Sequence, residues 1–353
     1  MSASATDANP ADALLDTRGA GHELGAWVVA LAFARDGSAC GFALGDGTIR
    51  LADPAEPRAA WRTVEAHPGS ACQSLVADAS PDALLSGGDD GRVVRTVGAS
   101  GETAQVASYG MMKWVEHLAT HPGGPRAVAV GKAVHLLDGR TGERLKTLAH
   151  PSTVGGVALD AKGKRVFASH YGGCSAWFVA AKEDKPRVLE WKGSHHAIAV
   201  APDASHVVTA MQEPALHGWR LSDGQHMRMS GYPAKCRSLS FSPKGRWLAT
   251  AGVDAVVLWP FFGGGPMGKA PTELAGGDGV QCTAVAFHPQ HEVVAAGFAD
   301  GLVLMAEVAS GKVVPVAAPG RGPVSALGWS ATGAHLAFGT ETGFAALVDL
   351  SRR

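Results

Sequence analysis

Three residues that can bind a transition metal recur at intervals of 41 and 46 residues along the chain. They are His195, Cys236 and Cys282. Imidazole nitrogen and thiolate sulfur are ligands that Zn²⁺ takes, with the nitrogen about 2.0 Å and the sulfur about 2.3 Å from the metal. A zinc finger has far shorter spacings, so these residues share a site only in a fold that brings distant segments together.

A second stretch has the spacing of a phosphate-binding loop. Residues 263–269, GGGPMGK, match the pattern G-x-x-x-x-G-K. However, Ala270 stands where a Ser or Thr must reach magnesium, and Pro271 begins an expected strand where a helix N-terminus should hold the phosphate. We therefore interpret the stretch as a loop between two strands and not as a nucleotide site.

Charge and composition exclude several functional classes. The 353 residues include 31 Lys and Arg against 32 Asp and Glu, a net charge of −1, so the basic field of a nucleic-acid binder is missing. No run of about 18 apolar residues occurs, and the N-terminus lacks a secretory signal pattern. The five cysteines show no C-x-x-C spacing, which argues against a disulfide framework. We expect a cytoplasmic protein with no nucleic-acid or membrane partner.

The elements that must position these residues repeat along the chain. Runs such as VVALAFA and CGFAL are short, rich in Val, Ala and Leu, and bounded by Gly, Asp or Pro, which is typical of strands. Eight such units can be aligned on the turn between their first two runs, at Gly37, Pro81, Gly124, Gly163, Ala204, Gly245, His291 and Gly333. The spacings of 39 to 46 residues fit β-propeller blades of about 40 to 50 residues.

A fourth run usually completes each unit, and four antiparallel strands make a blade. We expect an all-β closed β-propeller, a single domain over residues 11–353, that follows a flexible tail of residues 1–10. Eight blades are favoured and seven are the alternative. Because the last unit ends before a fourth strand, residues 11–18 are predicted to pair with it as an N-terminal strand and close the ring.

The units resemble those of the WD-repeat β-propeller family from about residue 11 to residue 350. The carriers are Gly21-His22 before the first unit, SGGDDGRV at 86–93, SFSPKG at 240–245 and the Asp-Gly turn pairs. No Trp-Asp dipeptide occurs, so the repeats are divergent. The resemblance implies a rigid scaffold that presents its loops to partner proteins and is not an enzyme.

In that family, the Asp of the turn between the second and third strands bonds toward the preceding His. The resemblance implies such structural turn contacts for His22 with Asp46, for His67 with Asp90 and Ser86, and for Asp300. His, Asp and Ser also serve in nucleophilic hydrolysis. Because the same types recur at equivalent positions without a G-x-S-x-G elbow, we predict no catalytic residue.

The repeat also places the three metal-capable residues. Each stands at the start of the first, innermost strand of its unit, a position that otherwise holds mostly Val, and the three units are consecutive. Three interpretations follow: these side chains pack as buried groups, they converge near the channel mouth and bind zinc, or the thiols act in redox sensing.

Residues just before the innermost strands, and in the nearby connections, are predicted to line a protein-binding rim. They are Trp27, Trp114, Lys235, Arg237, Met111, Met112 and Tyr232. Aromatic residues and Arg are enriched as interface anchors. The alternative is that the two Trp side chains wedge between blades.

The favoured function is a non-enzymatic protein interaction scaffold without a cofactor and with an unidentified protein partner. The alternative is a metal-handling or metal-sensing protein that binds zinc through His195, Cys236 and Cys282. An enzyme acting on a small molecule in the channel would need several inward carboxylates near one mouth, and the starts of the first strands show none.

Overall fold

β-Strands form nearly all of the regular structure. The computed structural model describes residues 13–351, and in this range it contains 30 strands and one helix, α1 (Ala13–Arg18). The apolar runs form the strands, because Val and other β-branched residues suit a pleated surface, and Gly, Asp and Pro form the turns. The all-β prediction is confirmed. In the same range, no helix is long and apolar enough to cross a membrane.

The strands of residues 13–351 form seven antiparallel sheets, of which six have four strands. Three of them come early in the chain: β2 (Val28–Phe33), β3 (Cys40–Leu44), β4 (Thr48–Ala52), β5 (Arg62–Glu65); β6 (Cys72–Ala77), β7 (Ala83–Gly88), β8 (Arg92–Val97), β9 (Thr103–Ser108); and β10 (His117–Thr120), β11 (Arg126–Val130), β12 (Ala133–Leu137), β13 (Arg144–Ala149). Two come later: β20 (Leu239–Phe241), β21 (Trp247–Thr250), β22 (Ala255–Pro260), β23 (Thr272–Gly276); and β24 (Cys282–Phe287), β25 (Val293–Phe298), β26 (Val303–Glu307), β27 (Val313–Ala317). The last is β28 (Val324–Trp329), β29 (His335–Thr340), β30 (Phe344–Asp349) and β1 (Gly19–Glu23).

The remaining sheet has six strands and holds both the fourth and the fifth predicted units. Its strands are β14 (Gly156–Leu159), β15 (Arg165–Phe178), β16 (Arg187–Val200), β17 (His206–Met211), β18 (Ala215–Arg220) and β19 (His226–Ser230). The prediction of eight separate blades is therefore wrong, and seven, the alternative count, is the number of sheets in residues 13–351.

The two units merge because β15 and β16 run on where other units have breaks. β16 passes from the outer part of the fourth unit directly into the first strand of the fifth, whereas residues 66–71 form a loop at the equivalent link between β5 and β6. In β15, Tyr171 pairs with Ser194 across the join, so strand pairing continues at the point where a turn was expected.

The repeat of the sequence persists inside the merged sheet. The backbone N–H of Val179 donates to the carbonyl of Lys164, as the N–H of Phe261 donates to the carbonyl of Arg246 in the sixth unit. All eight anchor positions lie between the first and second strands of their units. Each anchor position therefore lies in a turn between two strands, although the boundary between two of the units is not a sheet boundary.

A strand of the N-terminal segment closes the ring, as predicted, but this strand, β1, lies after the predicted residues 11–18. β1 pairs antiparallel with β30, from Gly19 opposite Val348 to Glu23 opposite Phe344. Residues 13–18 of the segment predicted to make this strand form α1 instead. Glycine lets β1 approach β30 closely, because a side chain at Gly21 would overlap the Phe344 ring and one at Gly19 would overlap the carbonyl of Leu347. Residues 11 and 12 and the predicted tail of residues 1–10 lie outside the described residues.

The last sheet contacts the first one across the closure. The Ser325 hydroxyl donates to the carbonyl of Val28 at 2.6 Å, a bond between residues 297 positions apart. The backbone N–H of Leu24 donates to the carbonyl of Gly343 at 2.8 Å. These bonds, with the β1–β30 pairing, give a closed propeller.

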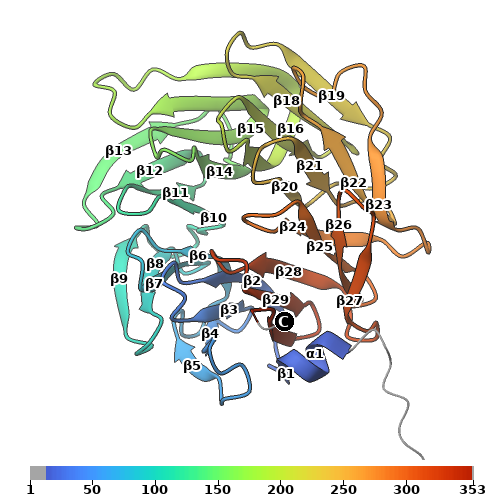
Figure 1. The fold of residues 1–353 in the computed structure, drawn as a ribbon. Helices are drawn as coiled ribbons and strands as arrows, with labels where there is room; N and C mark the ends of the chain where they lie inside the picture. Colours follow the sequence, from blue (N-terminus) through green and yellow to red (C-terminus); the bar gives the residue numbers. More distant parts are fainter. Residues whose placement is uncertain (1–12, 352–353) are drawn as a thin grey trace, which may run out of the picture.

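Figure 1 shows the sheets arranged around a common centre, with β6, β10, β20 and β24 near the middle and β9 and β13 at the outer edge. Second strands such as β3 and β7 are buried along their whole length, whereas the fourth strand β9 is mostly exposed. The core lies between neighbouring sheets, where Ile49 and Leu84 meet fully buried. Burial of such a side chain contributes about 2 kcal/mol. This packing holds the innermost strands in place around the channel.

Candidate functional site

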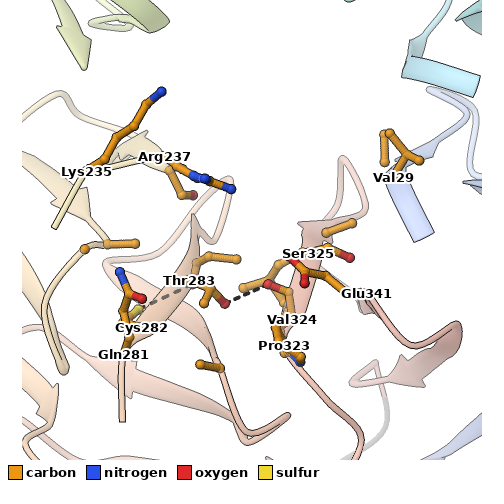
Figure 2. Close-up of a pocket in the computed structure, with 18 of the residues that line it drawn as sticks. Val29, Lys235, Arg237, Gln281, Cys282, Thr283, Pro323, Val324, Ser325 and Glu341 are labelled. Carbon is orange, nitrogen blue, oxygen red and sulfur yellow. Dashed lines mark hydrogen bonds between the residues drawn. The ribbon is translucent and has the colours of Figure 1, made fainter. Parts of the chain in front are cut away.

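A cavity of about 670 Å³ opens at the mouth of the central channel (Figure 2). We call the following lining residues the channel mouth: Trp27, Val29, Lys235, Arg237, Gln281, Thr283, Pro323, Ser325 and Glu341. Except for Glu341, which lies in the turn after β29, they stand at or just before the innermost strands β2, β20, β24 and β28. The sixth, seventh and eighth units, together with the first unit at the other end of the chain, therefore contribute to one cavity.

Bulges at the starts of the innermost strands decide which side chains face this cavity. Pairing shifts between Val28 and Ala30 in β2, and the same shift occurs at the start of β24 and of β28. A bulge leaves one residue unpaired and re-aims its side chain. The residues at the shifts are Val29, Thr283 and Ser325, and all three line the cavity.

Hydroxyl groups on the innermost strands tie each sheet to the next. Thr283 Oγ1 donates to the carbonyl of Val324 at 2.7 Å, and Ser74 Oγ donates to the carbonyl of Val115 at 2.8 Å. With the Ser325 bond to Val28, the contacts repeat at three sheet junctions. They fix the spacing of the innermost strands, so the cavity has a rigid wall.

Two cations stand on the sixth-unit side of the channel mouth. Figure 2 shows Arg237 reaching into the open space, with Lys235 beside it on the same wall. Lys235 Nζ donates to Gln212 Oε1 at 2.9 Å. Among the described residues, no carboxylate lies within ion-pair distance of either cation. Burial, and next the charge of Arg237, lower the pKa of Lys235.

The channel continues into a second cavity of about 380 Å³ that shares Arg237 and Ser238 with the first. Its wall includes Glu116 and His117. Burial, and next the proximity of His196, lower the pKa of His117 to about 4. Burial and then the charges of Lys235 and Arg237 lower the pKa of His196.

The predicted rim residues other than Tyr232 are accessible. Trp27 and Trp114 are 50% and 48% exposed, and Met111 and Met112 are more than 70% exposed. Trp27 and Trp114 both come just before an innermost strand, so they lie at the same end of the ring as the channel mouth. Half of each Trp side chain is open, so neither is enclosed between sheets.

Tyr232 is buried, and its prediction as a contact residue is wrong. It is 8% exposed, its hydroxyl lies 2.6 Å from Thr250 Oγ1, and it accepts a hydrogen bond from Trp259 Nε1 at 2.6 Å. Burial raises its pKa. The residue serves the sixth unit as His67 serves the second, because each precedes the first strand of its unit and contacts a hydroxyl on the second strand. In the sixth unit, the phenol of Tyr232 therefore makes the hydroxyl contact that an imidazole makes in the second.

The structure places His67 against Asp90 and Ser86, in a buried network. His67 Nδ1 lies 3.1 Å from both carboxylate oxygens of Asp90, and Nε2 lies 2.9 Å from Ser86 Oγ. Burial lowers the pKa of His67, so the ring is neutral and its Nδ1–H donates to Asp90. The network is closed to solvent and holds the turn.

The predicted contact between His22 and Asp46 is absent. His22 lies in β1, opposite Ala345 of the last sheet, and its ring packs on Trp61 at 4.6 Å. Asp46 instead accepts bonds from the N–H and hydroxyl of Thr48. Pairing of β1 with β30 holds His22 away from the turn. Asp300 accepts from the backbone N–H of Leu302 at 3.0 Å and so stabilises its own turn.

The structure does not join His195, Cys236 and Cys282 into a metal site. His195 has both ring nitrogens occupied, by Thr209 Oγ1 at 2.7 Å and by the carbonyl of Trp191 at 2.9 Å. Each thiol is buried in a different hydrophobic cluster, and burial raises the pKa of both to about 12. Within residues 13–351, no group of three His, Cys, Asp or Glu side chains could hold a metal ion. At Cys282 a bulge explains the error, because the next residue, Thr283, lines the cavity while the thiol stays buried.

The G-x-x-x-x-G-K stretch forms the expected loop between β22 and β23. Lys269 Nζ donates to the carbonyls of Phe262 and Gly265 and lies 4.7 Å from the centre of the Phe262 ring. Its ammonium group therefore stabilises the loop itself.

A comparison with family models now adds to this geometry. A model described as "WD domain, G-beta repeat" matches residues 225–258, which lie in the fifth and sixth units. This segment is similar to a WD repeat, and the propeller as a whole resembles the WD-repeat family. The single matched segment agrees with the divergence of the other repeats, in which no Trp-Asp dipeptide occurs.

Two known proteins resemble this WD-repeat propeller. "Autophagy-related protein 16" of Arabidopsis thaliana is 24% identical over 307 residues, which are 85% of this chain. The chain spans only 59% of the length of that relative. The crystal structure of the computationally designed Ika8 protein matches with a TM-score of 0.72 at 21% identity, covering 93% of this chain and 97% of that one. At this identity the likeness shows the fold.

Several channel-mouth residues of the WD-repeat propeller escaped the sequence analysis. The following residues line the cavity but were not predicted from the sequence: Gln281, Thr283, Pro323, Ser325 and Glu341. The signal that could have found them is position, because each bulge residue directly follows the aligned start of an innermost strand. Residue type alone gave no signal, since Thr and Ser are common in strands.

Proposed function

We propose that this WD-repeat propeller is a non-enzymatic scaffold that binds a partner protein at the channel mouth. The observation that carries the proposal is the half-exposed Trp27 on the wall of a cavity that also holds Lys235 and Arg237. An aromatic anchor beside cations in a concave, rigid site is typical of protein interfaces.

The surrounding surface supports a contact larger than the cavity. Trp114, Met111 and Met112 present exposed apolar groups at the same end of the ring. Flexible Met side chains adapt to a partner surface, and a Trp anchor at an interface contributes about 2 kcal/mol or more. We propose that Trp27 and Trp114 are the main anchors.

The chemistry of the buried polar groups favours binding over catalysis. The His67 network, which has the residue types of a hydrolase, is buried with its ring nitrogens already occupied. No substrate can reach it without unfolding the turn. A non-enzymatic role is therefore the proposal that accounts for its position.

Affinity capture with two variants tests the proposal. Full-length wild-type chain, the double variant Trp27→Ala/Trp114→Ala, and the control Phe178→Ala are used to capture proteins from extract of the source cells. Phe178 is 64% exposed at the end of β15, next to Lys164 and so at the opposite end of the ring. We expect one partner to be retained by wild type and by the control but lost from the double variant.

The captured partner is then purified and its Kd measured by calorimetry. Each single Trp→Ala change should weaken binding roughly 30-fold, as expected for an anchor worth about 2 kcal/mol. Unchanged affinity in both single variants, with folding intact by circular dichroism, would contradict the proposal. Unfolding of the double variant would show instead that the two Trp side chains belong to the core.

A further inference from the structure

We propose that the channel mouth binds an oxyanion, either carboxylate or phosphate, that is carried by an extended peptide segment of the partner. Arg237 is the principal contact and Lys235 the second. The inference rests on the proposed function, since it names the chemistry that the same site recognises.

The positive charges of Arg237 and Lys235 are not compensated by a carboxylate of the described residues. Arg237 and Lys235 stand two positions apart at the start of the sixth unit, and no carboxylate among the described residues pairs with either. Elsewhere in the ring, two arginines at strand starts do have such partners: Arg126 bonds Asp78 and Arg165 bonds Asp160. Two like charges on one cavity wall repel each other, and a bound anion removes that cost.

The wall that carries Arg237 and Lys235 also offers free hydrogen-bond donors. Arg237 has five N–H groups in a planar fork that suits two oxygens at once, and none bonds within residues 13–351. Lys235 uses one donor on Gln212. The exposed amide of Gln281 lines the same cavity. The hydroxyls of Thr283 and Ser325, by contrast, already donate to backbone carbonyls. The free donors therefore gather on one wall.

The shape and polarity of the cavity suit an extended peptide segment. A volume of about 670 Å³ is within the range of sites that enclose small ligands or a few residues of extended chain. Trp27 supplies an apolar wall for a neighbouring side chain. Glu341, exposed on the eighth-unit side, opposes a second anion there and can accept an N–H from the bound backbone. The opposite charges of the two walls give the bound segment a direction.

Peptide mixtures of fixed composition provide the test. Full-length chain is immobilised and incubated with four libraries of the form X-X-X-Z-X-X-X, where X is any residue except Cys and Z is Glu, phosphoserine, Gln or Lys. Bound peptide is quantified by mass spectrometry. We expect Glu or phosphoserine to be retained about 10-fold more than Gln, and Lys least. Stronger retention of phosphoserine identifies phosphate as the source, and equal or stronger retention of Glu identifies carboxylate.

Matched variants assign the effect to the cations. Arg237→Ala should reduce the retention of the Glu and phosphoserine libraries to that of the Gln library. Arg237→Lys should keep part of the preference for the acidic libraries, and Glu341→Gln should raise this preference about 2-fold. Lys244→Ala is the control, because Lys244 is exposed at the other end of β20. It should change nothing.

Equal retention of all four libraries by wild type, or an acidic preference that survives Arg237→Ala in a folded variant, would overturn the inference. The proposed function is tested separately by the Trp variants. If partner capture is lost in Trp27→Ala/Trp114→Ala but unaffected by Arg237→Ala, the scaffold role stands and the oxyanion inference fails.

Discussion

The second unit and the merged fourth and fifth units use buried histidine in opposite ways. In the second unit, His67 donates to Asp90 and the turn at Asp90-Gly91 closes the hairpin. In the fifth unit, His217 is fully buried, neither ring nitrogen has a hydrogen-bond partner, and the ring stacks on Trp191 at 3.9 Å. One histidine locks a turn, and the other fills the core.

The two histidines differ because a turn carboxylate, that of Asp90, lies beside His67, whereas no carboxylate of the described residues bonds to His217. Where Asp occupies the turn, an imidazole can bond to it and the strands end in a tight turn. At the equivalent turns of the merged sheet stand Tyr171-Gly172 and Glu213-Pro214, and no carboxylate bonds to the buried rings of His195 or His217. At His67, Asp90 offsets part of the lowering of the pKa that burial causes, whereas His217 has no such partner among the described residues, so the merged sheet is the more sensitive to acid.

The largest expected effect is the loss of the anion from the second unit. Asp90→Ala leaves the His67 Nδ1–H buried without an acceptor and removes the partner of Arg92. We expect a loss of about 3 kcal/mol in the free energy of unfolding, measured by urea denaturation. The matched control is Asp46→Ala, at the equivalent turn of the first unit, where the His contact is absent. It should cost about 1 kcal/mol, and equal losses would show that the His contact adds nothing.

Acid should act next, on the merged sheet and also on the third unit, where burial lowers the pKa of His117 to about 4. Burial, and then the proximity of His226 and His195, lower the pKa of His217 to about 3, and burial lowers that of His150 to about 4. The unfolded chain binds these protons below about pH 6.5 and the folded chain does not, so stability falls as the pH drops from about 6.5 toward 3.

Each such histidine contributes at most about 1.4 kcal/mol per pH unit in that range. Thermal unfolding between pH 7 and pH 4 measures the slope. His217→Phe should make it shallower, whereas His291→Phe, at an exposed turn position, should not. If His217→Phe has the same slope of stability against pH as wild type, His217 is not a source of the acid sensitivity.

The sixth unit offers an intermediate case, because Tyr232 replaces the histidine there. Tyr232→Phe removes the acceptor of Trp259 Nε1 and the partner of Thr250. We expect a loss of about 1 to 2 kcal/mol in the free energy of unfolding. Partner binding should be unchanged. A variant with wild-type stability and weakened binding would return Tyr232 to the contact surface.

The smallest effect is expected at the start of the innermost strands. Cys236→Val introduces the residue that Val154 and Val324 already supply at equivalent positions, so the change in Tm should be within about 3 °C. Zinc content of the purified protein, measured by plasma mass spectrometry, should be the same in wild type and variant. A large fall in Tm together with lost zinc would restore the metal hypothesis.

The strands, the turns and the period of the ring could be predicted because they depend on local patterns. Gly245 in its turn and the alternating runs around it define a unit without knowledge of any distant contact. The exchange of His67 for Tyr232 could not be predicted in the same way. A phenol and an imidazole reach the same buried hydroxyl position, but only their packed surroundings reveal it.

By itself, the sequence determined the repeat, the all-β class and the need for an N-terminal strand, because hydrophobic periodicity and turn residues act over a few positions. The tertiary structure decided the rest. The merging of two units into one sheet depends on continuous pairing between Tyr171 and Ser194. The bulges aim Thr283 and Ser325 at the channel and leave Cys282 in the core. A shift of one residue reverses the facing of a strand, and only packing between sheets fixes that shift.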